Sequence, residues 1–229
     1  MSRRRGITLA ELLIGVGVLA IALFLLGYAL HHQRGEARRI RCRDNLQQLA
    51  KGMTTYLSMY GDNRFYPWPA ARAGCGTRAD PQFGGAEWLA GLYWEYQIIP
   101  DPGVFVCPSS RDDNQNGRLL GSWGCTGGKP LSPPTVSYAG MGDRSEGIYL
   151  ASKQGKGASY ASSKLAIRDD FPPDQAMACD DTEEPINHGS RDNGGMNVLF
   201  FDSHVEWWTH ERVDLERGVG SGELVHLRN

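Results

Sequence analysis

The feature that most constrains this chain is an apolar stretch close to its N-terminus. Residues 7–30 contain a single charged side chain, Glu11, and three arginines, Arg3 to Arg5, come before the stretch. As a helix, these residues rise about 1.5 Å each and exceed the roughly 30 Å hydrocarbon core of a bilayer. The stretch therefore predicts a membrane-spanning helix, and a carboxylate inside such a helix is costly unless it has a partner.

Glu11 gains a candidate partner if the chain is cut after Gly6. Cleavage makes Ile7 the new N-terminus, and its positively charged amine lies about one helical turn from Glu11. The carboxylate would neutralise that amine, or the amine of a neighbouring copy in the same membrane. Because breaking such a pair in hydrocarbon leaves a charge exposed, we expect Glu11 to set subunit register during assembly.

Residues 3–13, Arg-Arg-Arg-Gly-Ile-Thr-Leu-Ala-Glu-Leu-Leu, resemble the processing signal of type IV pilins and type II secretion pseudopilins. That signal begins with a short basic leader that ends in a glycine, and the chain is cut after this glycine. The mature chain then begins with an apolar residue, followed by Thr-Leu, any residue and a glutamate, and continues as an apolar helix. The resemblance implies that a prepilin peptidase cuts between Gly6 and Ile7 and methylates the amine of Ile7. Ile7 stands where phenylalanine is usual.

A cleaved secretory signal and a plain membrane anchor are the competing interpretations of the apolar stretch. A secretory signal has a shorter apolar core followed by a small-residue cleavage site. Residues 31–34, His-His-Gln-Arg, offer no such site. A plain anchor has no use for Glu11.

The resemblance implies a structural protein, not an enzyme, that polymerises through its N-terminal helix. Its implied partners are copies of itself or other pilins and pseudopilins, the prepilin peptidase, an inner-membrane assembly platform and membrane lipid. The chain would cross the inner membrane once with its head outside the cytoplasm, and then enter a periplasmic or cell-surface filament. The competing hypothesis is a non-polymerising, membrane-anchored module that binds polysaccharide through its aromatic head, since all six tryptophans follow residue 61.

Charge gives no sign of a nucleic-acid partner. The formal net charge is −2, and the one basic cluster after the apolar stretch lies within residues 34–43. We expect this cluster to cover a solvated helix face or to touch lipid headgroups.

The helical pattern continues past the membrane stretch. Apolar residues recur at intervals of three and four, and no proline occurs before Pro67. This stripe is Ile40, Leu46, Leu49, Met53, Tyr56, Leu57 and Tyr60. We expect one helix from about residue 7 to residue 60, ended by Gly61-Asp62-Asn63, with one side to bury.

These patterns predict an α+β fold, in which a long N-terminal helix packs on a loop-rich antiparallel β-sheet head, as the resemblance to pilins also implies. The expected parts are a leader over 1–6, a membrane or filament-core helix over 7–30, an amphipathic extension over 31–61 and a head over 62–229. Within the head we expect a short helix over 87–96, a strand over 103–107 and an exposed loop over 152–163.

Two strands are expected near the C-terminus, Met196–Phe201 and His204–Trp208, joined by Asp202-Ser203. A two-residue type I′ turn needs positive φ at both positions, where glycine is preferred. Ser203 therefore predicts either a strained turn or a different turn type. Trp207 and Trp208 point to opposite faces of such a strand, so one of them should lie nearer solvent.

Several segments resemble a planctomycete-type group of pilin-like proteins. Those proteins carry an Asn-His, a glycine-rich step, Asn-Val-Leu-Phe and then Asp-Gly-His-Val. The matching segments are 41–49, 105–109, Asn187-His188 and 194–205. Ser203 replaces the glycine, and the gap between His188 and Asp202 is longer than in that group.

Five cysteines are present: Cys42, Cys75, Cys107, Cys125 and Cys179. A head in an oxidising compartment is expected to form disulfides. Among the three possible pairings of the four head cysteines we favour Cys107 with Cys125, which closes a modest loop, and then Cys75 with Cys179. Cys42, on the long helix, is left over. A zinc site is the competing interpretation, although the chain has no Cys-x-x-Cys pair.

Calcium is the one candidate cofactor. Asp112, Asn114 and Asn116 supply alternate oxygens before Gly117, as in the first half of a calcium loop. The twelfth position is Trp123 where an EF-hand has glutamate, so the loop is not an EF-hand. A polar surface turn is the competing interpretation.

A second group of polar residues near the C-terminus raises the alternative of a metallohydrolase. Its members are His188, Asp192, Asp202, His204 and His210, with Asp180 and Asp181 nearby. The structural interpretation is that Asp202 makes a turn, His204 faces outward and His188 hydrogen-bonds to a loop. The resemblance to filament proteins favours this second interpretation.

Overall fold

The structure is a computed structural model, which describes residues 8–60, 63, 66–67, 85–94, 97–122, 135–141, 169, 171–180, 186–215, 222–224 and 226–228. The chain divides into two compact units, residues 1–38 and residues 39–229. Gly6, Ile7 and the loop predicted over 152–163 lie outside the described residues.

Helix α1 (Leu9–Met59) confirms the prediction of one long N-terminal helix. It begins with a capping box, because Thr8 and Glu11 satisfy each other's free polar groups. The Glu11 carboxylate accepts hydrogen bonds from the Thr8 backbone N–H and from its hydroxyl, both at 2.9 Å, and the Glu11 N–H donates to Thr8 Oγ1 at 3.3 Å. The first turn of the helix therefore carries its own partners for N–H groups that no carbonyl of the helix can reach.

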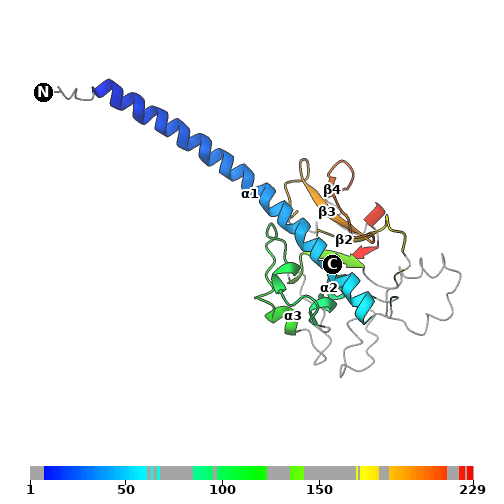
Figure 1. Ribbon diagram of the computed structural model, residues 1–229. Helices are drawn as coiled ribbons and strands as arrows, with labels where there is room; N and C mark the ends of the chain where they lie inside the picture. Colours follow the sequence, from blue (N-terminus) through cyan, green and yellow to red (C-terminus); the bar gives the residue numbers. More distant parts are fainter. Residues whose placement is uncertain are drawn as a thin grey trace. The chain divides into compact units, whose positions relative to one another are not determined.

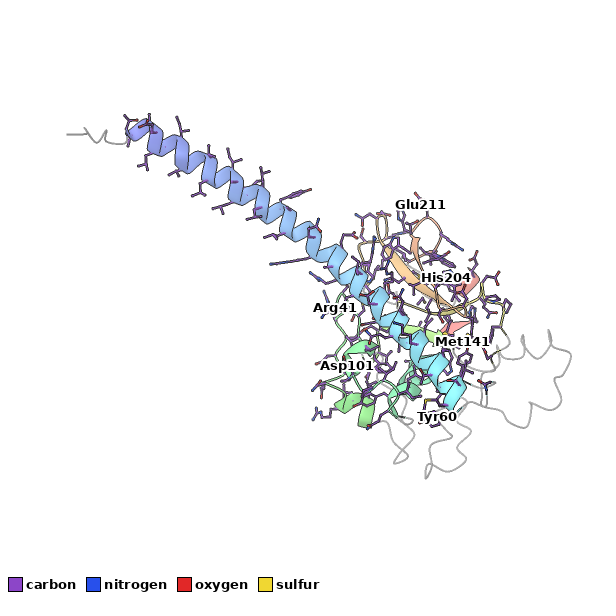
Figure 2. The ribbon with its side chains drawn as sticks, in the orientation of Figure 1. Arg41, Tyr60, Asp101, Met141, His204 and Glu211 are labelled. Carbon is purple, nitrogen blue, oxygen red and sulfur yellow. A yellow bond between two sulfur atoms is a disulfide. The ribbon has the colours of Figure 1, made fainter. Side chains whose placement is uncertain are left out.

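The first part of α1 is long and apolar enough to cross a membrane. Its large apolar side chains between Leu9 and Leu30 are 51–75% exposed. Figure 2 shows them projecting all around this part of the helix. No single stripe is reserved for packing against one neighbour, so this surface suits lipid or several surrounding helices.

The second unit contains every strand that the structure describes, arranged with the C-terminal part of α1 and several short helices (Figure 1). Its elements are α2 (Gly85–Trp94), η2 (Pro102–Phe105), α3 (Arg118–Ser122), β1 (Tyr138–Met141), β2 (Ala176–Asp180), β3 (Gly195–Phe200), β4 (Val205–Thr209), η4 (Gly222–Leu224) and β5 (Leu227–Arg228). Helix α2 confirms the short helix expected over 87–96, and it packs on β1.

The strands form one antiparallel sheet in the order β4-β3-β2-β1-β5. Strands β1, β2 and β3 are buried along their whole length. A strand buried at every position has both faces of the sheet covered, whereas a strand with one wet face alternates. The α+β class is therefore confirmed, and the sheet is an inner layer of the head.

The predicted helical stripe supplies part of the core of the second unit. Leu46, Leu49 and Met53 are fully buried, in the same apolar cluster as the sheet. At the two ends of the stripe, Ile40 and Tyr60 are 48% and 41% exposed. The buried part of α1 thus runs for about four turns, and the predicted stripe was slightly too long.

The strand predicted over residues 103–107 is wrong. Residues 102–105 form the 3₁₀ turn η2, because Asp101 caps it and Pro102 occupies its first position. The Asp101 carboxylate accepts a hydrogen bond from Gly103 N at 2.8 Å. Capping aspartate and proline favour a helical start, and this local chemistry outweighs the β-propensity of Val104 and Phe105.

Strands β3 and β4 confirm the predicted C-terminal hairpin, but the connection is a three-residue loop. The N–H of Ser203 donates to the Phe200 carbonyl at 2.9 Å, and the N–H of Phe200 donates to the His204 carbonyl at 3.0 Å. Ser203 alone in this loop has a positive φ, of 73°. This is a turn followed by a left-handed residue, a position at which glycine is preferred.

The substitution Ser203→Gly is expected to stabilise the head by up to about 1 kcal/mol, because it removes the left-handed strain on a residue with a Cβ. Thermal unfolding of the full chain in detergent, followed by tryptophan fluorescence, measures the change. Ser58→Gly is the matched control. Ser58 lies in α1, where glycine costs about 0.5 kcal/mol, so the same exchange should have the opposite sign.

Candidate functional site

A disulfide between Cys42 and Cys107 joins α1 to the segment that follows η2. The two Cα atoms are 5.2 Å apart, the cysteines are 65 residues apart in sequence, and both are fully buried. The predicted pairing of Cys107 with Cys125 is therefore wrong, and Cys42 is not left over. Loop length was a poor guide, because the entropy of closing a loop rises only slowly with its length.

The other cysteines fall outside this bond. Cys75 and Cys125 lie outside the described residues, and Cys179 is fully buried in β2. The predicted pairing of Cys75 with Cys179 stays a prediction.

Asn45 adds a second link one turn after Cys42, on the same face of α1. Its Nδ2 donates to the Val106 carbonyl and to the Tyr138 hydroxyl, each at 3.1 Å, and lies 3.4 Å from the Gly103 carbonyl. Burial, and then the Asp180 carboxylate, raise the pKa of Tyr138 well above its ordinary value, so this hydroxyl stays protonated. A covalent bond and a side-chain amide together hold α1 against residues 103–107.

A glycine-rich turn delivers His188 to the same place. The Gly195 N–H donates to the His188 carbonyl at 3.1 Å, and the two residues form an isolated β-bridge. Gly189 has a φ of +84°, and a Cβ on Gly194 would lie only 2.4 Å from the Ser190 carbonyl oxygen. The turn therefore closes only with glycine at these two positions, which explains the Asn-His-Gly and Gly-Gly steps of the sequence.

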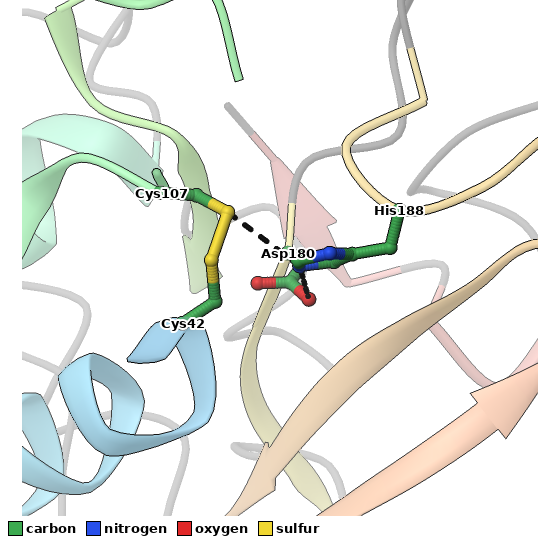
Figure 3. Close-up of side chains that lie close together, drawn as sticks. All are labelled: Cys42, Cys107, Asp180 and His188. Atoms are coloured by element: carbon green, nitrogen blue, oxygen red, sulfur yellow. Dashed lines mark hydrogen bonds and ion pairs between the residues drawn. A yellow bond between two sulfur atoms is a disulfide. The ribbon is translucent and has the colours of Figure 1, made fainter. Parts of the chain in front are cut away.

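The His188 ring contacts both the disulfide and a buried carboxylate (Figure 3). His188 Nε2 is 3.5 Å from Cys107 Sγ and 3.3 Å from Asp180 Oδ2. Asn197 donates to the same Asp180 oxygen twice, from its backbone N–H at 2.7 Å and from Nδ2 at 2.8 Å. The Asp180 and Asn197 side chains are 1% and 2% exposed.

The Asp180 carboxylate is satisfied on one side only. Its Oδ1 atom is buried and makes no hydrogen bond with any described residue. A buried polar atom without a partner costs about 1–3 kcal/mol, more when it belongs to a charged group. The site therefore has spare capacity for a donor or a cation.

Trp207 packs against the His188 side of the site. Its ring meets the His188 ring edge-on, with centroids 5.7 Å apart, and the Arg39 guanidinium lies 4.6 Å above it. Trp208, the next residue, is 3% exposed and lies beneath Arg212. The expectation that the two rings differ in exposure is confirmed, since Trp207 is only half-buried.

The geometry differs from that of a hydrolytic triad. In such a triad the nucleophile hydrogen-bonds to one nitrogen of the histidine and the carboxylate to the other, so that the ring is held in the orientation in which it can take the nucleophile's proton. Here Cys107 and Asp180 both approach Nε2. The arrangement instead converges four ligand-type atoms, those of Cys42, Cys107, Asp180 and His188, within 4.8 Å of one another.

The residues of the metallohydrolase alternative do not come together as one group. Among the described residues, the only group of three or more candidate ligands is the cysteine, histidine and aspartate cluster. Asp202 and His204 contact each other on the exposed hairpin loop, and Asp192 is exposed as well. Of the residues considered for that alternative, only Asp180 and His188 belong to the cluster. Asp181 lies outside the described residues.

The calcium hypothesis stays a prediction, and the structure shows how its residues are used. Asn114 is 5% exposed, its Nδ2 donates to the Pro102 carbonyl at 2.6 Å, and its Oδ1 accepts from Gly117 N at 3.1 Å. Asp112 is half-buried and Asn116 is exposed. The middle residue of the predicted ligand set is therefore committed to stabilising the turn.

Sequence reasoning missed the roles of Cys42, Asn45 and Asn197. A signal was present, because Cys42 and Asn45 fall on the predicted apolar stripe together with Leu49. The four segments that carry the second resemblance also converge here, since they contain Cys42, Cys107, His188 and Asn197.

Comparisons with family models, curated proteins and solved structures find no match to this chain. The chemistry of the site and of the N-terminal helix therefore carries the functional argument.

Replacing either disulfide cysteine is expected to destabilise the head equally. Cys42→Ala and Cys107→Ala should each cost about 4 kcal/mol, the chain-entropy value for a 65-residue loop, and the double variant should cost little more. Unfolding of the full chain in detergent without reductant measures this. Cys125→Ala is the control, and a much smaller loss for Cys42→Ala than for Cys107→Ala would contradict the pairing.

Proposed function

We propose that this chain is a structural subunit of a filament of the type IV pilus or type II secretion pseudopilus kind. The observation that carries the proposal is a basic leader and Gly6 directly before an apolar helix that has Glu11 in its first turn. In that helix, the side chains from Leu9 to Leu30 need to be covered by something other than this chain. The membrane covers them before assembly, and the helices of neighbouring subunits cover them in the filament.

The proposed pathway begins with a prepilin peptidase, which removes residues 1–6 and methylates Ile7. The subunit then waits in the inner membrane as a single-pass protein until an assembly platform lifts it into the filament. The Cys42–Cys107 disulfide supports a head outside the cytoplasm, because disulfides persist in oxidising compartments.

The polysaccharide-binding alternative needs exposed aromatic rings on the head. Among the described side chains of the second unit, the exposed large apolar residues are Ile40, Met59 and Tyr60, of which only Tyr60 is aromatic. Trp207 is half-buried beneath Arg39. The described surface therefore favours the filament proposal.

Glu11 has two candidate roles that can be separated. The capping box with Thr8 stabilises the start of α1, whereas the assembly role needs the negative charge to meet an N-terminal amine. Glutamine preserves the capping box and removes the charge. Alanine removes both.

The processing prediction concerns Gly6. Gly6→Leu should leave the leader attached and the protein in the membrane, since a bulky residue blocks the cut. Mass spectrometry of the mature natural protein should find an N-terminus at Ile7 with one added methyl group. A mature chain that begins after residue 30 would instead indicate a secretory signal.

The assembly prediction compares Glu11→Gln with Glu11→Ala. Both variants should insert into the membrane at least as well as the natural chain, because a charge in hydrocarbon is removed. Both should lose incorporation into sheared filaments. Thr8→Ala is the control, because it removes the hydroxyl of the capping box and keeps the charge. If Glu11→Gln assembles normally and Glu11→Ala does not, the residue acts only as a cap and the proposed pairing is wrong.

A further inference from the structure

We propose that a zinc ion and the disulfide are alternative occupants of the buried cluster. In the reduced chain, the thiolates of Cys42 and Cys107, the His188 imidazole and the Asp180 carboxylate bind one Zn²⁺. This inference rests on the second unit alone and does not depend on the filament proposal.

The cluster has the number of ligands that zinc requires, and the four ligand atoms already lie close together. One ligand atom from each of the four residues lies within 4.8 Å of the other three. The residues come from four separate places: α1, the segment after η2, the end of β2 and the glycine turn before β3. In Figure 3 the His188 ring and the Asp180 carboxylate lie on the same side of the disulfide.

The orphaned Asp180 oxygen points to a cation. Oδ2 of this carboxylate accepts two hydrogen bonds from Asn197, whereas the buried Oδ1 has no hydrogen-bond donor among the described residues. A metal bound at Oδ1 supplies the missing positive charge. The two hydrogen bonds from Asn197 then act as the outer support that zinc ligands usually have.

The chemical type of the ligands selects the metal. Two thiolates, one imidazole and one carboxylate form a tetrahedral set of mixed softness, which suits Zn²⁺ and not Ca²⁺ or Mg²⁺. Zinc–sulfur bonds of about 2.3 Å place two tetrahedral sulfurs roughly 3.8 Å apart, so the disulfide and the metal exclude each other. Rotation of the two cysteine side chains provides this separation.

The exchange between the disulfide state and the zinc-bound state conserves atoms and electrons. A dithiol reductant transfers two electrons and two protons to the disulfide, becomes a disulfide itself and leaves two thiols on this chain. Zn²⁺ then displaces the two thiol protons. In the reverse direction, the two thiolates give two electrons to a disulfide-bearing oxidant, which takes up two protons and becomes a dithiol. The Cys42–Cys107 bond forms and Zn²⁺ is released.

The consequence is that the head can be tied to α1 before oxidation. Zinc would link Cys42 to Cys107 as the disulfide does, and would add direct bonds to β2 and to the glycine turn. The second unit would therefore reach its native packing in the thiol state, and oxidation would replace the metal by a covalent bond.

The test uses the full chain in detergent with the changes Cys75→Ser, Cys125→Ser and Cys179→Ala, which leave only Cys42 and Cys107. The chain is reduced with a phosphine under anaerobic conditions and titrated with Co²⁺, whose visible spectrum reports coordination. We expect one Co²⁺ per chain, with tetrahedral bands and a thiolate charge-transfer band, displaced by one equivalent of Zn²⁺. The oxidised chain should show neither band.

His188→Ala and Asp180→Asn should each weaken Co²⁺ binding at least about tenfold and shift its bands, since the loss of a ligand exceeds the usual effect of an outer-shell partner. The paired control is His204→Ala with Asp202→Asn, a histidine and aspartate that touch each other but lie on the exposed hairpin loop. This control should leave the titration unchanged. Unchanged spectra in His188→Ala would show that two thiols alone hold the metal, which would overturn the proposal.

A second measurement covers the case in which a variant fails to fold. In the natural chain, reduced with the phosphine, one equivalent of Zn²⁺ should protect both Cys42 and Cys107 from alkylation, as read by peptide mass spectrometry. Equal labelling of the two cysteines with and without Zn²⁺ would also overturn the proposal.

Discussion

The link between α1 and residues 103–107 is the constraint on which the second unit depends. Leu46, Leu49 and Met53 of α1 are core residues of the sheet layer, so the sheet cannot be covered unless the helix is seated in one register. Cys42 and Asn45 set that register, one by a covalent bond and the other through the Val106 carbonyl. The apolar contacts alone do not discriminate well between registers, because a slide along the stripe replaces one leucine by another.

The glycine turn before β3 couples the sheet to the same link. Gly189 and Gly194 let the chain fold back so that His188 lies over Cys107, and Asn197 then anchors Asp180 from the adjacent strand. Asn197 Nδ2 also lies 3.5 Å from the Arg39 carbonyl of α1. A change in any one of these polar groups leaves another buried without a partner, which makes the cluster cooperative.

The parts that the sequence predicts correctly are those with local signals. Helical intervals identify α1, and two runs rich in apolar and aromatic residues with a short polar connection identify β3 and β4. The pairing of Cys42 with Cys107 depends instead on how distant segments pack, and no local pattern reports it. No local pattern reports the role of Asp180 either, because that role depends on its contacts with Asn197 and His188. The failure at residues 103–107 differs in kind, because the capping signal of Asp101-Pro102 was present and was outweighed in the prediction by Val104 and Phe105.

Two carboxylates, Glu11 and Asp180, occupy positions where a charge is unfavourable, one in the apolar helix and one in the buried cluster. The same pattern of hydrogen bonds stabilises both. Each receives two hydrogen bonds on one oxygen from a nearby residue, Thr8 for Glu11 and Asn197 for Asp180. These bonds fix the orientation of the carboxylate while leaving the other oxygen to face a cation. Under the two proposals that cation is a subunit's N-terminal amine for Glu11 and Zn²⁺ for Asp180. A carboxylate oriented in advance binds its cation with less loss of side-chain freedom, which is the physical advantage of placing a costly charge at a defined position.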